Sequence, residues 1–546
     1  MGFRRWETLK IFSVCFGTLL VLHGTLLRLP YFWDEAGYYV PAARDILLRG
    51  SLIPLTTVSN AHPPLVMIWL AAAWKVLGYS TWVTRTAMLV VAAFSLTGLY
   101  KLAARAANPV VAFYTIALTA LYPVFFAQSS LGHVDLAAAG LTFWGLAAYL
   151  EQRPRAMAFW FCLAVLAKET ALLTPAVLGV WEVCGFAALR WPSKDRGAGG
   201  PWHKGWAERL WAGRSGPGDP RRRSAWLLAA LASPLLPLSY WYAFHFAGTG
   251  YVFGNPEFVR YNVTATLSVT RVAITMVLRI WQVVGYMHLW LLTIAMVAAM
   301  ALAPRRDGGV ERPRISIAVQ MVLLLIVVAY VVAMSVIGGA VLARYMLTAV
   351  PLVILVAVST IWRRVPWWRA VLTAVGVAFI VAWWWNPPHG FSPEDNLTYR
   401  DFVVLHQDAD RYLAEHAHGR PVLTAWPAYD ELRRPWLGYI SQPVPVIKIE
   451  NFSEPEIAAA AAERDRYGLA LVFSTKYEAH PWNLVWPAWE AAKARMFDYH
   501  EDVTPAVAAQ KLGGSIVFSE QRGKLWFAVI EIEHVELAGA AGAIQP

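Results

Sequence analysis

Polar and charged residues stand beside apolar segments of this chain, where they are costly unless they have a function. Asp34 and Glu35 follow the first apolar segment, and His62 precedes two prolines. Asp34 could be a helix N-cap, a position where aspartate is favoured. Pro41 argues against capping, because proline fits best in a first helical turn. A helix that begins beyond the two carboxylates would leave them available for chemistry.

Three more segments carry ionisable residues at the ends of apolar runs. They are LGHVDLAAAG with His133 and Asp135, LAKETALL with Lys168 and Glu169, and ARYMLTAVP with Arg344 and Tyr345. On the topology derived below, these groups and the Asp34 segment lie at one depth, near the outer membrane surface. Because polar groups at that depth must be paired or hydrated, we expect them to share a polar cavity.

Each of these residues also has a plainer interpretation. Lys168 and Glu169 could pair with each other at a helix end, Arg344 could anchor at phospholipid head groups, and His62 could be a turn residue. His133 and Asp135 are of the types that bind divalent cations, although two residues alone are a weak signal for a metal site.

The composition determines which elements must position these residues. Of the 546 residues, 58% are hydrophobic and only 15% are charged, which is typical of a polytopic membrane protein. Apolar runs recur from residue 10 to residue 385, and the sequence then becomes mixed and charged. We therefore expect an α-helical membrane domain at 1–385 and a small external domain at 386–546.

Eleven membrane-spanning helices are predicted, and every second loop between them is basic. The predicted spans are 10–28, 83–103, 109–127, 133–150, 155–168, 170–188, 226–247, 272–302, 315–337, 342–360 and 367–385. By the positive-inside rule the basic loops are cytoplasmic. The N-terminus is then on the cytoplasmic side of the inner (plasma) membrane, and the C-terminal domain is on the external (periplasmic) side. The net charge of +11 thus sets topology and does not indicate nucleic acid as a partner.

The apolar segment 64–78 is not expected to cross the membrane. If it crossed, the basic loops that follow would change sides, so we expect it to lie against the outer face or to be partly re-entrant.

The tail is expected to be an α/β domain. It has helical patterns at 399–417 and 454–467 and strand patterns at 421–426, 443–449, 469–475 and 515–533.

These features together resemble the GT-C glycosyltransferase superfamily, and most of all the protein O-mannosyltransferase and lipid A aminoarabinose transferase group (glycosyltransferase family 39-like). The resemblance rests on Asp34-Glu35, the His62-Pro63-Pro64-Leu65 helix start, the His133-x-Asp135 pair and the lysine between spans. It covers roughly residues 10–385. Where the aminoarabinose transferases have Glu-Lys-Pro-Pro, this chain has Ala61-His62-Pro63-Pro64, which argues against an aminoarabinose donor.

The resemblance implies an enzyme that takes a sugar from a polyprenyl-phosphate donor and passes it, with inversion, to an acceptor on the outer face. Asp34 matches the family's catalytic carboxylate, and Glu35 its neighbour. A carboxylate can accept the proton of an attacking hydroxyl. Lys168 and Arg344 are the candidates for stabilising the leaving phosphate, with a metal ion on His133 and Asp135 as a supplement. His62, Glu169 and Tyr345 are expected to contact substrate.

The expected partners are membrane lipids, the lipid-linked sugar donor, and a glycan, lipid or protein acceptor. A transporter or flippase of a lipid-linked substrate would also need a polar cavity. Transporters, however, usually have inverted repeats and sites near the membrane midplane, and the sequence contains no evident repeat. An assembly factor acting through its external domain would have little reason to keep carboxylates and cations at one depth.

Overall fold

The chain divides into two compact units. The computed structural model describes residues 5–190, 220–256, 259, 267–337, 339–477, 491, 494–497 and 499–533. Unit 1 comprises Met1–Leu27, Tyr38–Asn386 and Glu394–Asn396, and unit 2 comprises Arg28–Gly37, Pro387–Pro393 and Leu397–Pro546. Each unit is described by itself below.

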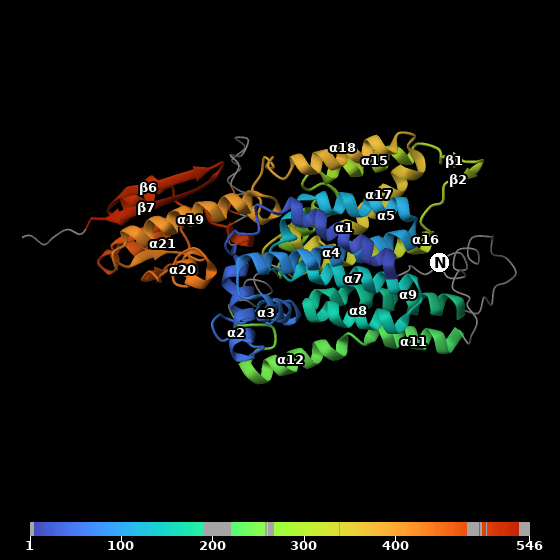
Figure 1. Cartoon of the computed structure of the whole chain (residues 1–546), viewed down its shortest axis with the longest axis horizontal. Coiled ribbons are helices and arrows are strands. Elements are labelled where there is room, and N and C mark those ends of the chain that lie inside the picture. The colour runs from blue at the N-terminus through green and yellow to red at the C-terminus, as the bar shows by residue number, and fades with distance from the viewer. Residues whose placement is uncertain are drawn as a thin grey trace, which may run out of the picture. The chain divides into compact units, whose positions relative to one another are not determined.

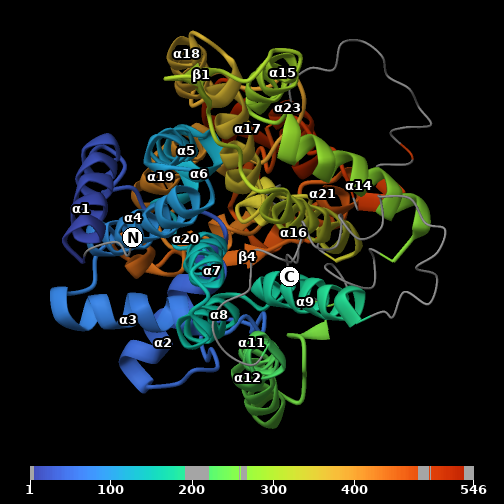
Figure 2. The same cartoon turned by 90° about the vertical axis from the view of Figure 1, so that its right-hand side faces the viewer.

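Unit 1 is a bundle of helices (Figures 1 and 2). Its first half contains α1 (Arg5–Leu22), α2 (Val40–Arg49), α3 (Leu65–Leu77), α4 (Thr81–Ala106), α5 (Pro109–Leu121), α6 (Pro123–Gln128), α7 (Asp135–Leu150), α8 (Pro154–Ala167) and α9 (Leu173–Arg190). Its second half contains α11 (Pro220–Ala232), α12 (Leu235–Thr249), α14 (Val269–Val284), α15 (Leu289–Met300), α16 (Ile317–Val336), α17 (Val350–Arg364) and α18 (Trp368–Val381), with a short hairpin of β1 (Arg306–Asp307) and β2 (Val310–Glu311). Helices therefore occupy each apolar segment identified in the sequence.

Several of the predicted spans are interrupted. The expected span 109–127 is divided where Pro123 begins α6, because proline has no N–H to continue the α5 hydrogen-bond pattern. The expected span 272–302 is bent by 75° between α14 and α15. At that bend Met287 and His288 have positive φ values of 47° and 64°, which no α-helix accommodates.

Helix length and composition support a membrane location for unit 1 but not a count of eleven spans. Among the described residues, three helices are long and apolar enough to cross a membrane, Thr81–Ala106, Ala225–Thr249 and Ile317–Val336, and the bent α14–α15 pair is a candidate fourth. Other apolar helices, α3 among them, have 10–17 residues. The predicted number and orientation of the spans therefore remain predictions.

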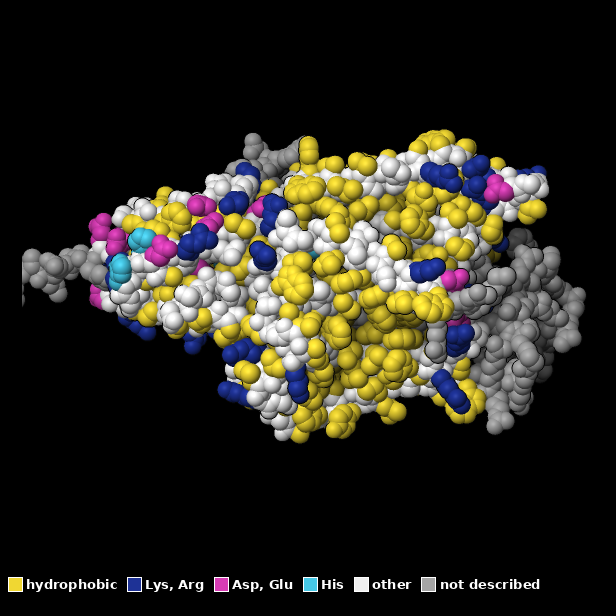
Figure 3. All heavy atoms as spheres, in the orientation of Figure 1, with side chains coloured by type: hydrophobic (Ala, Val, Ile, Leu, Met, Phe, Trp, Pro, Cys, Tyr) yellow, Lys and Arg dark blue, Asp and Glu magenta, His cyan; other side chains and the backbone are white. Residues whose placement is uncertain are grey.

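The surface of unit 1 has the character expected for a lipid-facing bundle. Hydrophobic side chains cover most of the helices in Figure 3, while Lys and Arg lie toward the two ends of the bundle, one of which carries β1 and β2. Large apolar side chains such as Val21, Val76 and Val269 are at least 80% exposed. Exposed apolar side chains in such number would be unfavourable in water and are expected against lipid.

Helices α4 and α7 approach each other closely because glycines line their contact. A Cβ atom on Gly140 of α7 would lie 1.9 Å from Ser95 Oγ and 2.9 Å from Ser95 Cα on α4. On the α4 side, a Cβ atom on Gly98 would lie 2.6 Å from the Trp144 ring. Ser95 Oγ also donates to the Leu136 carbonyl, at 3.3 Å, within the first turn of α7. The glycines thus fix the position of α7 against α4.

Unit 2 contains an α/β sheet, as the tail sequence predicts. Its elements are α19 (Thr398–His416), β3 (Val422–Thr424), α20 (Ala428–Glu431), β4 (Val446–Lys448), α21 (Glu454–Ala461), β5 (Leu469–Phe473), α23 (Pro505–Leu512), β6 (Gly514–Arg522) and β7 (Leu525–Ile532). The strand order is β4-β3-β5-β7-β6, parallel over the first three strands and antiparallel over β5, β7 and β6. Every residue of β5 is buried, as expected for the central strand of a covered sheet.

A group of buried ionisable residues, here called the α19 acid cluster, consists of His406, Asp410 and Glu431. His406 Nδ1 lies 2.6 Å from Glu431 Oε2, and the His406 ring stacks on Phe402. All three side chains are buried, with exposures of 2% or less. Burial lowers the pKa of His406 to about 4 and raises the pKa of Asp410 and of Glu431 well above their usual values. The cluster therefore favours protonated carboxyl groups beside a neutral imidazole.

Candidate active site

Helix ends in unit 1 bring the predicted polar residues together. Asp135 begins α7, and Arg344 and Tyr345 lie in the 3₁₀ turn Ala343–Met346 ahead of α17. Lys168 follows α8 with an extended backbone, φ −156° and ψ 132°, which ends that helix before Glu169 starts the next turn. Because each residue sits where a helix stops or starts, its side chain can reach the space between helices.

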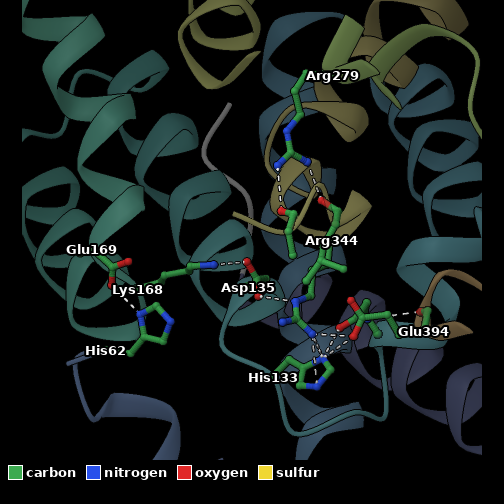
Figure 4. A network of polar contacts seen from close by, with 11 residues as sticks. His62, His133, Asp135, Lys168, Glu169, Arg279, Arg344 and Glu394 are labelled. Atoms are coloured by element: carbon green, nitrogen blue, oxygen red, sulfur yellow. Dashed lines mark hydrogen bonds and ion pairs between the residues drawn. The ribbon is translucent and has the colours of Figure 1, made fainter. Parts of the chain in front are cut away.

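The core of the site is a chain of ion pairs (Figure 4). Lys168 Nζ lies 2.6 Å from Asp135 Oδ1, and Arg344 Nε lies 3.4 Å from Asp135 Oδ2. Arg344 Nη1 donates to Glu394 Oε2 at 2.5 Å. All four side chains are 7% exposed or less. Ionised groups this deeply buried must be paired, and the carboxylates hold both cations in fixed positions.

His133 extends this chain of contacts. Its Nδ1 atom lies 2.7 Å from Gln128 Oε1 and 3.2 Å from Arg344 Nη1, and its ring is completely buried. The ring of Tyr39 meets it edge-on, with centroids 5.8 Å apart. The expected convergence of His133, Asp135, Lys168 and Arg344 is therefore present in the structure.

The contacts of His133 and Asp135 do not fit a divalent metal ion. Each residue faces a cationic side chain at hydrogen-bonding or ion-pair distance, and a metal ion between them would be repelled. Within the described part of the chain, no group of three or more His, Cys, Asp or Glu side chains is positioned to hold a metal. The residues present therefore do not fit the metal ion expected at this pair.

Three cations surround the ring of Tyr345. Lys168 Nζ lies 4.3 Å from the ring centroid, and the guanidinium carbons of Arg279 and Arg344 lie 5.4 and 5.7 Å from it. The face of an aromatic ring attracts cations at these distances. Tyr345 thus separates three like charges while keeping them within a small volume.

Arg279 and Glu394 are site residues that the sequence analysis did not identify. Arg279 is fully buried on α14 and donates to the carbonyl of Leu342 at 2.7 Å and to Gln282 Oε1 at 2.8 Å. It therefore holds the segment that leads into Arg344. A charged residue inside an expected span is itself a functional signal and could have identified Arg279. Glu394 lies beyond the last predicted span, so its sequence position gave no comparable signal.

His62 and Glu169 form a second arm of the site. His62 Nδ1 lies 2.9 Å from Glu169 Oε2, and the His62 ring stacks on Tyr39 with centroids 6.2 Å apart. Lys168 and Glu169 are neighbours in sequence at the turn that follows α8. This one turn therefore directs a cation toward Asp135 and a carboxylate toward His62 (Figure 4).

Asp34 and Glu35 belong to unit 2. Glu35 is fully buried and its Oε2 atom accepts a hydrogen bond from the Phe32 backbone N–H at 2.9 Å, while Asp34 is half-buried. Glu35–Tyr39 is a π-helix, a rare form that often marks functional sites, and α2 begins at Val40 with Pro41 in its first turn. The helical backbone nevertheless begins at Asp34 and includes Glu35, so the prediction that the helix starts beyond the two carboxylates is wrong. The catalytic role of Asp34 and Glu35 remains a prediction.

Comparison with known proteins gives matches in structure but not in sequence. No protein-family model and no curated protein matches the chain. ArnT from Cupriavidus metallidurans bound to undecaprenyl phosphate has a similar structure, with a TM-score of 0.51 and 14% identity over 96% of this chain and 98% of that chain. Its apo state gives a TM-score of 0.50 and 14% identity over 95% and 97% of the two chains. The Archaeoglobus fulgidus oligosaccharyltransferase in complex with zinc and sulfate gives 0.43 and 10% identity over 85% and 68%.

The chain thus shares the fold of ArnT along almost its whole length. The resemblance to the GT-C superfamily that the sequence motifs suggested agrees with this shared fold.

Proposed function

We propose that this protein transfers a sugar from a polyprenyl-phosphate donor to an acceptor hydroxyl group on the outer face of the membrane, with inversion at the anomeric carbon. The observation that carries the proposal is the cluster of buried cations, Lys168, Arg279 and Arg344, around Tyr345. Two buried carboxylates, Asp135 and Glu394, pair with Lys168 and Arg344. Arg279 donates to the Leu342 carbonyl and to Gln282 Oε1, so its charge leaves a surplus suited to an anion.

A third carboxyl group does not remove this surplus completely. Asp395 accepts a hydrogen bond from the Tyr286 hydroxyl at 2.6 Å, and burial raises the pKa of Asp395 to about 7. It is therefore only partly ionised at neutral pH. A phosphate group with one or two negative charges would complete the charge balance of the site.

The similarity to ArnT bound to undecaprenyl phosphate supports a lipid phosphate as that anion. In the proposed reaction, the acceptor hydroxyl gives its proton to Asp34 while its oxygen forms a bond to the anomeric carbon. The bond between that carbon and the phosphate oxygen breaks, and polyprenyl phosphate leaves with the electron pair. Lys168 and Arg344 stabilise the charge that develops on the phosphate, at a point where burial strengthens the attraction.

The remaining residues would bind substrate. Tyr345 lies at the centre of the cation cluster, His62 and Glu169 lie beside Lys168, and Glu35 would support its neighbour Asp34. The protein is expected in the inner membrane with its N-terminus in the cytoplasm, since every second loop between the predicted spans is basic.

The test uses the full chain in lipid nanodiscs with a radiolabelled polyprenyl-phosphate sugar. Extracts of the cell envelope serve as acceptors, and mass spectrometry of glycans, lipid A and envelope proteins from cells with and without the protein identifies the product. Transfer of label that needs Asp34 supports the proposal. Movement of labelled lipid between leaflets with no labelled product would identify a flippase and would overturn it.

A further inference from the structure

A short segment from the beginning of the chain belongs to unit 2. This segment is Arg28–Gly37, and it includes Asp34 and Glu35. The rest of unit 2 is Pro387–Pro393 and Leu397–Pro546. The proposed base therefore packs with the C-terminal part of the chain, although the helices from α2 to α18 lie between them in sequence.

The turn directly ahead of Asp34 has a strained backbone. Trp33 has a φ of 43°, in the left-handed region that a bulky side chain rarely adopts. The Phe32 N–H donates to Glu35 Oε2, and the Glu35 N–H donates to the Phe32 carbonyl, both at 2.9 Å. A strained conformation of this kind persists only where the surrounding structure holds it, and such conformations cluster at functional sites.

Aromatic side chains of the C-terminal part of the chain supply that surrounding structure. The ring of Trp426, in the loop after β3, meets the Trp33 ring edge-on with centroids 4.9 Å apart. Phe402 of α19 meets Trp33 at 5.5 Å and Phe32 at 5.3 Å, also edge-on. Edge-to-face ring pairs attract each other in addition to the effect of burial. The turn is thus packed against both α19 and the loop after β3.

The backbone is also held on both sides of Asp34. Ahead of it, the Tyr439 hydroxyl donates to the Tyr31 carbonyl at 3.0 Å, and both of these tyrosines are buried. Beyond it, a Cβ atom on Gly37 would lie 2.7 Å from the Trp426 ring, so the indole lies directly against the main chain of this glycine. The segment therefore has little freedom to move within unit 2.

We propose that Phe402, Trp426 and Tyr439 are positioning residues for the proposed base. They hold the strained turn and thereby fix the backbone from which the Asp34 carboxylate extends. The C-terminal part of the chain is then required for catalysis through Asp34. The inference rests on the proposed function for the role of Asp34, whereas the hold on the turn can be measured without any transfer reaction.

The first test is hydrogen exchange of the full chain in lipid nanodiscs, followed by mass spectrometry of peptides that cover residues 31–37. Tyr439→Phe removes the hydroxyl group and keeps the ring. We expect exchange in this segment to become roughly three- to tenfold faster, the worth of one neutral hydrogen bond. The matched control is Tyr467→Phe, whose hydroxyl donates to the Ala460 carbonyl at 2.8 Å elsewhere in unit 2. Unchanged exchange in Tyr439→Phe, or the same acceleration in both variants, would overturn the proposal.

A second variant tests the aromatic contacts, because the Tyr439 hydroxyl also interacts with Glu431. Trp426→Ala should accelerate exchange of residues 31–37, and Trp426→Phe should do so less, since it keeps a ring at this position. The control for the loss of a large side chain is Phe452→Ala, which removes a fully buried ring that packs on Phe473 with centroids 4.8 Å apart. The proposal fails if Phe452→Ala accelerates exchange of the segment as much as Trp426→Ala does.

Steady-state transfer kinetics then test the link to the base. Lys168 and Arg344, the proposed phosphate ligands, belong to unit 1, so the donor KM should stay unchanged. We expect Trp426→Ala to lower kcat at least roughly tenfold, since a misplacement of about 1 Å can cost a hundredfold in rate. Tyr439→Phe should lower kcat in the same direction, and the two control variants should retain it. A raised donor KM with an unchanged kcat would contradict the positioning role.

The two measurements separate this inference from the proposed function. If the variants loosen the segment as expected but the wild-type chain transfers no sugar, the proposed function fails and the hold on the turn stands. If the wild type transfers sugar and the variants loosen the segment without lowering kcat, the positioning role fails and the proposed function stands.

Discussion

Substitutions in the ion pair between Arg344 and Glu394 can distinguish a structural role of Arg344 from a role in binding the donor phosphate. Both side chains are 3% exposed, and Arg344 Nη1 lies 2.5 Å from Glu394 Oε2. Replacing Arg344 by Met leaves a buried carboxylate without its main cation, a loss that costs about 3–5 kcal/mol. We therefore expect Arg344→Met to lower the thermal unfolding midpoint and to abolish tight donor binding at the same time.

A second substitution distinguishes the two effects. Arg344→Met combined with Glu394→Gln leaves no unpaired charge at this contact, and neutral replacement of a buried ion pair costs little. The double variant should regain most of the thermal stability and still bind the donor lipid more than tenfold more weakly than the wild type. Arg344→Lys should recover only part of the binding, since an ammonium cannot contact two phosphate oxygens as a guanidinium does.

The control is a pair of the same type with a solvent-exposed carboxylate. Arg363 Nη2 lies 3.1 Å from Glu311 Oε2, and the glutamate is 49% exposed, so the carboxylate left by Arg363→Met is hydrated and the change should cost less than Arg344→Met. The assays are thermal unfolding followed by intrinsic fluorescence and equilibrium binding of polyprenyl phosphate in nanodiscs. If the double variant recovers donor binding together with stability, Arg344 is a structural residue. If Arg344→Met is no less stable than Arg363→Met, the buried pair does not carry the energy assigned to it.

Three further predictions concern the proposed base, the topology and the α19 acid cluster. Asp34→Asn should reduce transfer at least a hundredfold without changing thermal stability, because the amide cannot accept the proton; near-normal turnover would exclude Asp34 as the base. Single cysteines replacing Thr57 and Arg400 should react with a membrane-impermeant thiol reagent on intact cells and one replacing Val310 should not; the opposite pattern would invert the topology. In the α19 acid cluster the pKa values of Asp410 and Glu431 are raised in the folded state, so the protonated carboxyl groups stabilise unit 2 at low pH. This contribution is lost as the pH rises above the usual pKa values of 3.8 and 4.5 and through the raised ones. His406, with its pKa lowered to about 4, opposes this below pH 6.5. In the wild type, hydrogen-exchange protection of α19 should therefore fall between pH 6.5 and 8. Asp410→Asn should make this fall smaller, because the amide does not titrate. A fall of the same size in the variant would show that Asp410 is ionised in the fold.

Sequence patterns located the helices and the polar residues well because both depend on local features. Apolar periodicity and length identify helices, and the strand patterns of the tail correspond to β3, β4, β5, β6 and β7. His133, Asp135, Lys168 and Arg344 stood out because ionisable residues are rare beside apolar segments. Their mutual distances follow from helix packing, which no local pattern encodes.

The features that sequence could not provide are the long-range ones. Glu394 pairs with Arg344 although 50 residues separate them and the sequence placed Glu394 in the external domain. Arg279, by contrast, could have been identified from the sequence as a charged residue inside a predicted span, although the average hydropathy of the span does not register it. The breaks inside the predicted spans depend on individual residues such as Pro123 and His288, so long apolar runs were taken as single helices.

The glycine contact between α4 and α7 determines where Asp135 lies, although its glycines are not part of the ion-pair chain. Asp135 is the first residue of α7, and the helix has little freedom to shift because Gly140 touches the Ser95 backbone. Gly140→Ala would force the helices apart, and Asp135 would move away from Lys168 with them. Since a displacement of about 1 Å can cost a hundredfold in rate, this change is expected to lower the proposed transfer activity about a hundredfold while leaving all the charged residues intact. A screen for loss of activity should therefore recover small-residue positions of the α4–α7 seam beside the ionised ones.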